Sequence, residues 1–300
     1  MTKKHIGTCC ICGREGKLTF EHIPPHKASN GFPLKLYNVG KYITENNARY
    51  SSLQNGAGAW TLCSSCNNLT GAWYGNAYVE FASQGITYYR KKAAGIISVP
   101  YTIYPLRVFK QIVSCFASVN GANWCKENPA IRDFLLNPKS RSFPDDVDIR
   151  MYLQSSGRCK LNGIEFVADV STGDQFCGSE FAYPPFAFVC DCSHGRYYSK
   201  SFQKLFSIRE FLKYNYDDRV TLYLNIPRKP CNPFLLDFRE GVPSIEEHSR
   251  QLREHAMATI HKHKGPSSST VPYVYVSNFL VFWQLSNQLL RFERNRDDGK

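Results

Sequence analysis

Two Cys-x-x-Cys pairs stand in the first quarter of this 300-residue chain, Cys9 with Cys12 and Cys63 with Cys66. The two-residue spacing lets both thiolates of a pair reach one metal ion, and four thiolates can enclose a zinc ion tetrahedrally. Such a closed site stabilises a fold and leaves no open position for chemistry. The sequence therefore predicts a structural zinc site formed by these four cysteines, with Cys10 as a non-ligand.

A second set of residues has the types needed for catalysis. Glu21 and His22 are adjacent between the two cysteine pairs, and Asn67 directly follows the last cysteine. A neutral imidazole, with a pKa of about 6.5, can take a proton from water at neutral pH. Carboxylate and amide oxygens suit Mg²⁺, which keeps several waters and binds phosphate oxygens. The three residues are candidates for a catalytic site, and a surface dipeptide without function is the alternative for Glu21-His22.

Residues 9–82 resemble HNH nucleases, also called the ββα-metal or His-Me finger group, in their four-cysteine zinc-bearing form. The strings that carry this resemblance are CxxCG, LTFEHIPP and CxxCNNLTGAWYG. The Cys-x-x-Cys-Asn arrangement also resembles the phage junction-resolving nucleases of that group. The resemblance implies a treble-clef-like, zinc-bound ββα-metal domain. It also implies an endonuclease that hydrolyses DNA and leaves a 5′-phosphate.

The resemblance assigns a role to each catalytic candidate. His22 would be the general base, while Glu21 and Asn67 would hold one Mg²⁺ or similar divalent ion at the scissile phosphate and the leaving 3′-oxygen. The family's middle asparagine is absent, because its place reads AWTLC and the nearest candidate, Asn55, lies further upstream. We therefore expect another carbonyl to orient His22. Since neighbours on a strand point to opposite faces, the family geometry also requires a local twist at Glu21.

Two other functions use the same residues. A non-catalytic zinc finger could bind nucleic acid or protein through the four-thiol scaffold, and a nuclease of the same architecture could cut RNA. The long trailing segment resembles, in layout alone, the sensor of a prokaryotic antiviral defence effector, which would respond to an activating ligand or partner protein. It could equally select the substrate, or form a homo-oligomer with two active sites that cut both strands.

Charge and composition favour a polyanionic partner in the cytoplasm. The formal net charge is +12, of which residues 1–100 carry +7, with 11 Lys or Arg against 4 Glu. A basic segment around the motif is typical of nucleic-acid binding, although it also serves solubility. No apolar run reaches the roughly 20 residues that cross a bilayer. The N-terminus lacks the features of a secretory signal. Twelve cysteines without such a signal indicate a reducing compartment.

The surrounding pattern predicts an α+β fold with two parts, a nuclease domain at 1–100 and a mixed α+β domain of unknown type at 101–300. A strand is expected at 18–23 and a loop at 26–59. A helix follows Cys66, with one apolar stripe made by Leu69, Trp73, Ala77 and Phe81. Gly71 and Gly75 lie off that stripe, where we expect them to allow close approach of a neighbour. Further helices are predicted at 106–119, 131–136 and 244–264, and strands at 147–153, 163–170, 186–190, 220–226 and 273–276.

Several weaker candidates have plain structural alternatives. Cys190, Cys192 and His194, with Cys177, could form a second metal site, or the thiols could simply be core residues. The histidines His255, His261 and His263 could contact phosphate or lie on a solvated basic face. The run Tyr88-Tyr89-Arg90-Lys91-Lys92 could contact a single strand or end a helix. His26 could bind phosphate or be an exposed loop residue.

Overall fold

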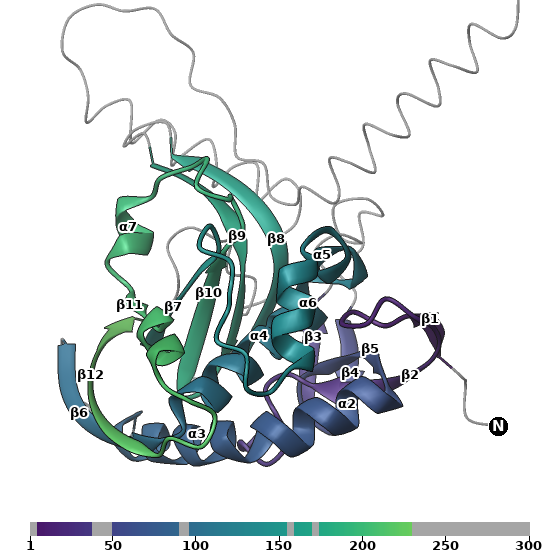
Figure 1. Ribbon diagram of the computed structural model, residues 1–300, viewed down its shortest axis with the longest axis horizontal. Helices are drawn as coiled ribbons and strands as arrows, with labels where there is room; N and C mark the ends of the chain where they lie inside the picture. Colours follow the sequence, from purple (N-terminus) through teal and green to yellow (C-terminus); the bar gives the residue numbers. More distant parts are fainter. Residues whose placement is uncertain (1–4, 38–49, 90–95, 155–158, 170–173, 230–300) are drawn as a thin grey trace, which may run out of the picture.

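A computed structural model describes residues 5–37, 50–89, 96–154, 159–169 and 174–229. In this part of the chain the fold is mixed α+β, as the sequence predicts, with a small three-stranded sheet, a two-stranded hairpin and a seven-stranded sheet. The strands of the large sheet curve beside helix α4 (Pro105–Asn120), and the small sheet lies on the other side of that helix (Figure 1).

The small sheet contains both halves of the candidate site. Its strands are β1 (Ile6–Thr8), β2 (Glu15–His22) and β5 (Gly58–Cys63), all antiparallel in the order β1-β2-β5. The expected strand at 18–23 is therefore confirmed as part of β2. A bulge shifts the register of β2 against β5, because Thr19 pairs with Leu62 whereas Phe20 pairs with Trp60.

The expectation of a continuous loop at 26–59 is wrong. Strands β3 (Leu34–Tyr37) and β4 (Tyr50–Leu53) pair as a hairpin inside that range, and β5 begins at Gly58. These strands are short, and two of them contain serines or glycine, so their sequence shows little of the alternation that identifies a strand. Pairing with partners distant in sequence outweighs this weak local preference.

The helix after the second cysteine pair is confirmed, and it contains an irregular turn. Helix α2 (Ser64–Thr70) continues through a π-helical turn (Gly71–Gly75, η1) into α3 (Asn76–Tyr89). Before and within this turn the buried side chains are Thr70 and Tyr74, one position later than Leu69 and Trp73 of the predicted stripe. The last two members of the stripe, Ala77 and Phe81, are buried as predicted. A π turn holds an extra residue, which changes the faces that a regular 3.6-residue period would give.

Among the described residues, no neighbouring backbone closely approaches the two glycines of the π turn, where the sequence predicts that a backbone or a ligand would do so. A Cβ atom at Gly71 would meet no atom within 4 Å, and one at Gly75 would meet only Gln111 Oε1 at 3.9 Å. The close approach occurs instead at Gly85 of α3, where a Cβ would lie 2.4 Å from the Phe186 ring. The helix thus packs against the large sheet through Gly85.

The large sheet has the strand order β6-β12-β7-β10-β9-β8, with β11 also paired to β7. Four of its strands were predicted, but β6, β9 and β11 were not. Helices α4 (Pro105–Asn120) and α6 (Pro129–Leu136) confirm the predictions at 106–119 and 131–136, and α5 (Ala122–Glu127) was missed. The remaining elements are β6 (Ile96–Ile103), β7 (Asp148–Gln154), β8 (Lys160–Asp169), β9 (Asp174–Tyr183), β10 (Phe186–Asp191), α7 (Lys200–Gln203), β11 (Phe206–Ser207), η2 (Arg209–Lys213) and β12 (Val220–Lys229).

One hydrophobic core joins the small sheet, the helices and the large sheet. It contains Cys9 and Leu62 near the N-terminus, most of α4, and Ile226 of β12. Helix α4 is buried on nearly all sides because it packs against both sheets. The division into domains at residue 100 stays a prediction, and this core includes residues from both sides of it.

None of the helices in the described ranges combines the length and the apolar character that crossing a bilayer requires. The predicted helix at 244–264 with its three histidines, the strand at 273–276 and the basic run at 90–92 lie outside the described residues.

Candidate metal centre and catalytic residues

The first cysteine pair lies in a tight turn between β1 and β2. The Cys9 amide donates to the Arg14 carbonyl at 2.9 Å, and the Gly13 amide donates to the Cys9 carbonyl at 2.9 Å. Gly13 has a φ of +72°, in the left-handed region that glycine adopts without strain. The turn therefore holds Cys9 and Cys12 at fixed positions.

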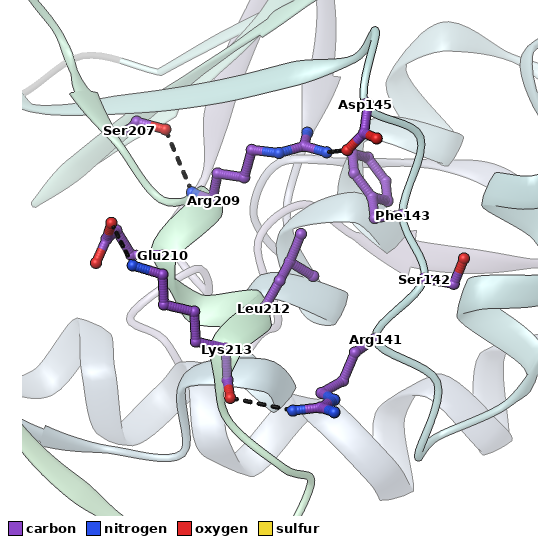
Figure 2. A pocket seen from close by; sticks show the side chains of 9 residues that line it. All are labelled: Arg141, Ser142, Phe143, Asp145, Ser207, Arg209, Glu210, Leu212 and Lys213. Carbon is purple, nitrogen blue, oxygen red and sulfur yellow. Dashed lines mark hydrogen bonds and ion pairs between the residues drawn. The ribbon is translucent and has the colours of Figure 1, made fainter.

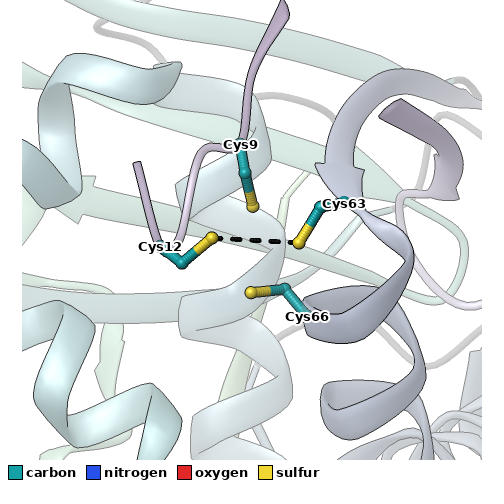
Figure 3. A group of neighbouring side chains, drawn as sticks. All are labelled: Cys9, Cys12, Cys63 and Cys66. Carbon is teal, nitrogen blue, oxygen red and sulfur yellow. Dashed lines mark hydrogen bonds between the residues drawn. The ribbon is translucent and has the colours of Figure 1, made fainter. Parts of the chain in front are cut away.

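The second pair spans the junction of a strand with a helix. Cys63 is the last residue of β5, and Cys66 lies in the first turn of α2. The two pairs meet so that all four Sγ atoms lie within 4.8 Å of one another, and Figure 3 shows them pointing toward a common centre. The Sγ atoms of Cys12 and Cys63 are 3.8 Å apart. A tetrahedron with Zn–S bonds of about 2.3 Å has S–S edges of about 3.8 Å, so the group could hold a structural metal such as zinc.

The surroundings of the thiols also suit a cation. The Cys66 thiol donates to the Cys9 sulfur, which lowers the pKa of Cys9 and raises that of Cys66. The Arg14 guanidinium bonds to Cys12, and its own pKa is raised by that contact. Its positive charge would offset part of the negative charge of a four-thiolate centre. Cys10 lies outside the group, and burial raises its pKa to about 12, which agrees with a non-ligand.

Hydrogen bonds connect the metal centre to the rest of the fold. The Cys10 amide donates to the Thr61 carbonyl at 2.9 Å, and the Thr61 hydroxyl donates to Ser118 Oγ of α4 at 2.8 Å. The Thr19 hydroxyl donates to the Leu62 carbonyl at 2.8 Å across the bulge between β2 and β5. The two strands that carry the candidate residues are thus tied both to the thiol centre and to the core.

Asn67 lies against the strand that contains Glu21 and His22. Its Nδ2 donates to Thr19 Oγ1 at 2.9 Å and, more weakly, to the Phe20 carbonyl at 3.4 Å. Thr19 is two positions before Glu21, so the two side chains share one face of β2. With Nδ2 engaged on the strand, the Asn67 amide has its oxygen left to serve as a metal ligand.

His22 is oriented by a backbone carbonyl, as expected, and that carbonyl belongs to Asn55. His22 Nε2 lies 2.9 Å from the Asn55 oxygen. Because a carbonyl can only accept, this contact fixes the hydrogen on Nε2 and leaves Nδ1 with a free lone pair. Burial lowers the pKa of His22, a shift that the Asn55 bond opposes. The half-buried imidazole therefore stays neutral, and able to accept a proton, at neutral pH.

The loop that presents the Asn55 carbonyl is held by Asn30, a residue within the range 26–59 that the sequence predicts as loop. Asn30 is fully buried, and its Nδ2 donates to the carbonyls of Pro24 at 2.6 Å and Ala57 at 2.8 Å. The Ala57 amide donates back to Asn30 Oδ1 at 2.6 Å. Asn30 thereby joins the segment after His22 to the segment after Asn55. No short-range pattern indicates a partner 27 residues away.

We expect Asn30→Ala to destabilise the protein by about 2–4 kcal/mol, because two carbonyls and one amide would lose their buried partner. The loss is measurable as a lower denaturant midpoint with an unchanged m-value. Ser29→Ala is the matched control, since Ser29 is the exposed neighbour. Equal stability of Asn30→Ala and Ser29→Ala would contradict this role for Asn30.

Glu21 lies on the opposite side of β2 from His22. The rings of Phe20 and His22 contact each other at a centroid distance of 5.0 Å, whereas the intervening Glu21 is only 6% exposed and faces the side of α4. Burial, and after it the charge of Glu21, raises the pKa of Cys115 in that helix. Although a bulge precedes Glu21 in the pairing of β2 with β5, it does not bring the carboxyl to the side of His22 that the resemblance requires. Burial raises the pKa of the Glu21 carboxyl to about 8.

This burial predicts a pH dependence of stability. Because the folded-state pKa of Glu21 lies above its unfolded value, the folded state binds more protons between pH 4.5 and 8. In EDTA, the unfolding free energy of the parent minus that of Glu21→Gln should therefore fall as pH rises from 4.5 to 8. The fall should be at most about 1.4 kcal/mol per pH unit. The difference between the two unfolding free energies, measured at several pH values, checks this. A difference independent of pH would mean that the carboxyl is already ionised in the fold.

The second proposed metal site is not formed. Cys190 and Cys192 have sulfurs 3.6 Å apart and are buried, while His194 pairs with Asp146 at 2.6 Å instead of approaching them. Within the described ranges, the four N-terminal cysteines are the one place where three or more such ligand groups gather. The core-thiol interpretation of Cys190 and Cys192 is the better one. His26 is exposed in the loop after β2, and its ring contacts that of His22.

An open pocket of about 680 Å³ lies between the α6–β7 connection and η2 (Figure 2). Of its cations, Arg209 pairs with Asp145, and Lys213 pairs with Glu210 at 2.9 Å. Arg141 donates to the Lys213 carbonyl at 3.2 Å. Because acids already neutralise two of these three cations, the pocket has little charge left to attract an anion.

Comparison with models of protein families gave no match, and comparisons with curated proteins and with solved structures gave none either. The functional interpretation therefore depends on the chain's own residues and their geometry.

Proposed function

We propose that the protein is a metal-dependent endonuclease that hydrolyses phosphodiester bonds of DNA, with His22 as its general base. The contact between His22 Nε2 and the Asn55 carbonyl carries this proposal. It sets the tautomer that exposes Nδ1, on a strand tied to a four-thiol centre. A histidine kept neutral and oriented by a carbonyl is equipped to accept a proton from water.

In the proposed reaction, His22 Nδ1 takes a proton from a water molecule as that water attacks the phosphorus. A new P–O bond forms while the bond to the 3′-oxygen breaks, and solvent returns a proton to this oxygen. The products are a 3′-hydroxyl and a 5′-phosphate. The Asn55 carbonyl stabilises the imidazolium that forms, because it accepts from the other ring nitrogen.

The observed side chains fit the two proposed metal sites unequally well. The four thiols would hold zinc, which would fix the ends of β5 and α2 and thereby place Asn67. Glu21 and Asn67 would hold Mg²⁺ or a similar ion, whose chemistry is to offset charge on the phosphate and the leaving oxygen. The two oxygen donors are of the right type, since Mg²⁺ needs few protein ligands. The carboxyl of Glu21 would have to lose its proton and reach the ion from a buried position.

This burial specifically favours a second candidate function, a non-catalytic zinc-bearing protein that binds nucleic acid. Glu21 and His22 lie on opposite faces of β2, and among the described residues no hydrogen bond joins either of them to Asn67. Such a protein would need the thiol centre and the positive charge, but neither the base nor the second ion.

A cleavage assay separates these candidates and the RNA-cutting alternative. Supercoiled plasmid and a labelled RNA are incubated in one tube with the full chain, with Mg²⁺ or with EDTA. The proposal predicts nicked plasmid with Mg²⁺ and intact plasmid with EDTA. Cut RNA beside intact plasmid would make the protein a ribonuclease. A protein that shifts the plasmid on a gel but never cuts it would be the binding protein.

The function of the large sheet is part of the same proposal. Control of the nuclease by an activating ligand, substrate selection and homo-oligomer formation all fit a domain that packs against α4, since this helix also contacts the small sheet. A defence role would require that such a signal change the cleavage rate.

A further inference from the structure

A continuous row of aromatic rings lies on the His22 side of the small sheet. We name it the ring row and define it as His5, Trp60, Phe20 and His22. His5 stacks on Trp60 with a centroid distance of 3.9 Å and an interplanar angle of 8°. Phe20 meets Trp60 edge-on at 5.7 Å and His22 at 5.0 Å. The row thus extends from β1 across the sheet to the proposed base.

The strand register explains how these rings come together. Phe20 pairs with Trp60, and His22 pairs with Gly58. A Cβ atom at Gly58 would lie 2.7 Å from the Phe20 ring and closer still to the Glu21 carbonyl oxygen, so the glycine leaves room for the Phe20 ring to lie edge-on to His22. The Leu18 amide of β2 donates to the His5 carbonyl, which places His5 beside that strand. The Leu18 side chain lies on the same side of the sheet and is only 7% exposed.

The row is accessible from outside, unlike the aromatic residues of the core. Trp60 is 43% exposed, while His5, Phe20 and His22 are half-buried. Large rings held rigidly at a surface are suited to stacking on a flat partner. In a nuclease site such a partner is a nucleobase, and the surplus of positive charge in residues 1–100 favours a polyanionic chain.

Stacking on a protein ring requires a base that is free of its own neighbours. Bases inside a duplex are stacked on both sides, whereas bases of a single strand can lie on aromatic side chains. We propose that the ring row binds an unpaired nucleobase next to the scissile phosphate, so that the substrate is single-stranded nucleic acid or a single-stranded part of a larger structure. This proposal rests on the proposed function for the position of the phosphate at His22.

Binding is tested in EDTA, where no cleavage occurs, with the full chain and fluorescently labelled oligonucleotides. The probes are oligo(dT), oligo(U) and a DNA hairpin of equal length, whose two strands are joined by a non-nucleotide linker so that it contains no unpaired base. Trp60→Leu should weaken binding of the single strands about 5- to 100-fold, as expected for the loss of one stacked base. Trp60→Phe should recover most of that affinity. Tyr223→Leu is the matched control, because Tyr223 is a 71% exposed aromatic residue on β12 outside the row.

The outcomes separate this inference from the nuclease proposal. Preferential binding of single strands that depends on Trp60 supports the inference, even if the protein never cuts. The inference is overturned if the parent binds the hairpin and the single strands with equal affinity, even if it cuts plasmid. It is also overturned if Trp60→Leu and Tyr223→Leu bind the single strands with equal affinity. Loss of zinc from Trp60→Leu would show that this variant misfolds. In that case Trp60→Phe tests the inference, because it must retain the parent's preference for single strands over the hairpin. The oligo(dT) and oligo(U) arms show which sugar the site accepts.

Discussion

Replacing Cys66 with serine is expected to remove the bound zinc and to leave most of the protein unfolded or aggregated. Cys66 is buried in the first turn of α2, and its sulfur belongs to the four-thiol group. Structural zinc contributes about 10–16 kcal/mol of apparent binding free energy at neutral pH. A domain has only about 5–15 kcal/mol of net stability. Zinc content and thermal unfolding of the purified variant provide the measurement.

Cys10→Ala is the control for this experiment. Cys10 is also buried and is adjacent to Cys9, but it lies outside the thiol group. It should retain one zinc per chain and lose only the packing of a small side chain. A Cys66→Ser protein that is soluble and fully loaded with zinc would contradict a site formed by four thiolates.

Replacing His22 with alanine is expected to reduce the cleavage rate about 10²- to 10⁴-fold, which is the usual contribution of a positioned general base. Zinc content and thermal stability should stay close to those of the parent, because within the described ranges the half-buried ring bonds to the Asn55 carbonyl and is not part of the four-thiol group. The rate is measured under single-turnover conditions with saturating Mg²⁺, so that binding does not limit it.

His194→Ala is the matched control, since this half-exposed histidine pairs with Asp146 near the end of β10, outside the candidate site. It should cut at the parent's rate. If His22→Ala cut as fast as His194→Ala, another group would have to be the base. A His22→Ala protein that lost its zinc would instead show that the histidine supports the fold.

Local motifs predicted the N-terminal part of the fold well. The strand predicted at 18–23 and the apolar period after Cys66 each depend on short-range chemistry, and the structure contains the strand and the helix that they indicate. The four thiols also gather as their spacing predicts. Such features can be predicted from the sequence because each depends only on neighbouring residues.

Features that depend on distant partners were not predictable in this way. Strand β5 is specified by its pairing with β2, and the orientation of His22 depends on a carbonyl 33 residues away. The burial of Glu21 depends on α4, which packs against that side of the small sheet. Because Glu21 faces α4 while His22 lies on the other face of β2, the proposed metal ligand and the proposed base do not share the side that the resemblance implies. The convergence of Glu21, Asn67 and His22 on one site is therefore the feature to test most directly.

Anomalous X-ray scattering from crystals of the full chain grown with Zn²⁺ and Mn²⁺ tests that convergence most directly. We expect a zinc peak at the centre of the four sulfurs. We also expect a manganese peak in contact with Glu21 and Asn67, between these two residues and His22. Manganese bound elsewhere, in a protein that Mn²⁺ activates for cleavage, would contradict the assignment of these two ligands.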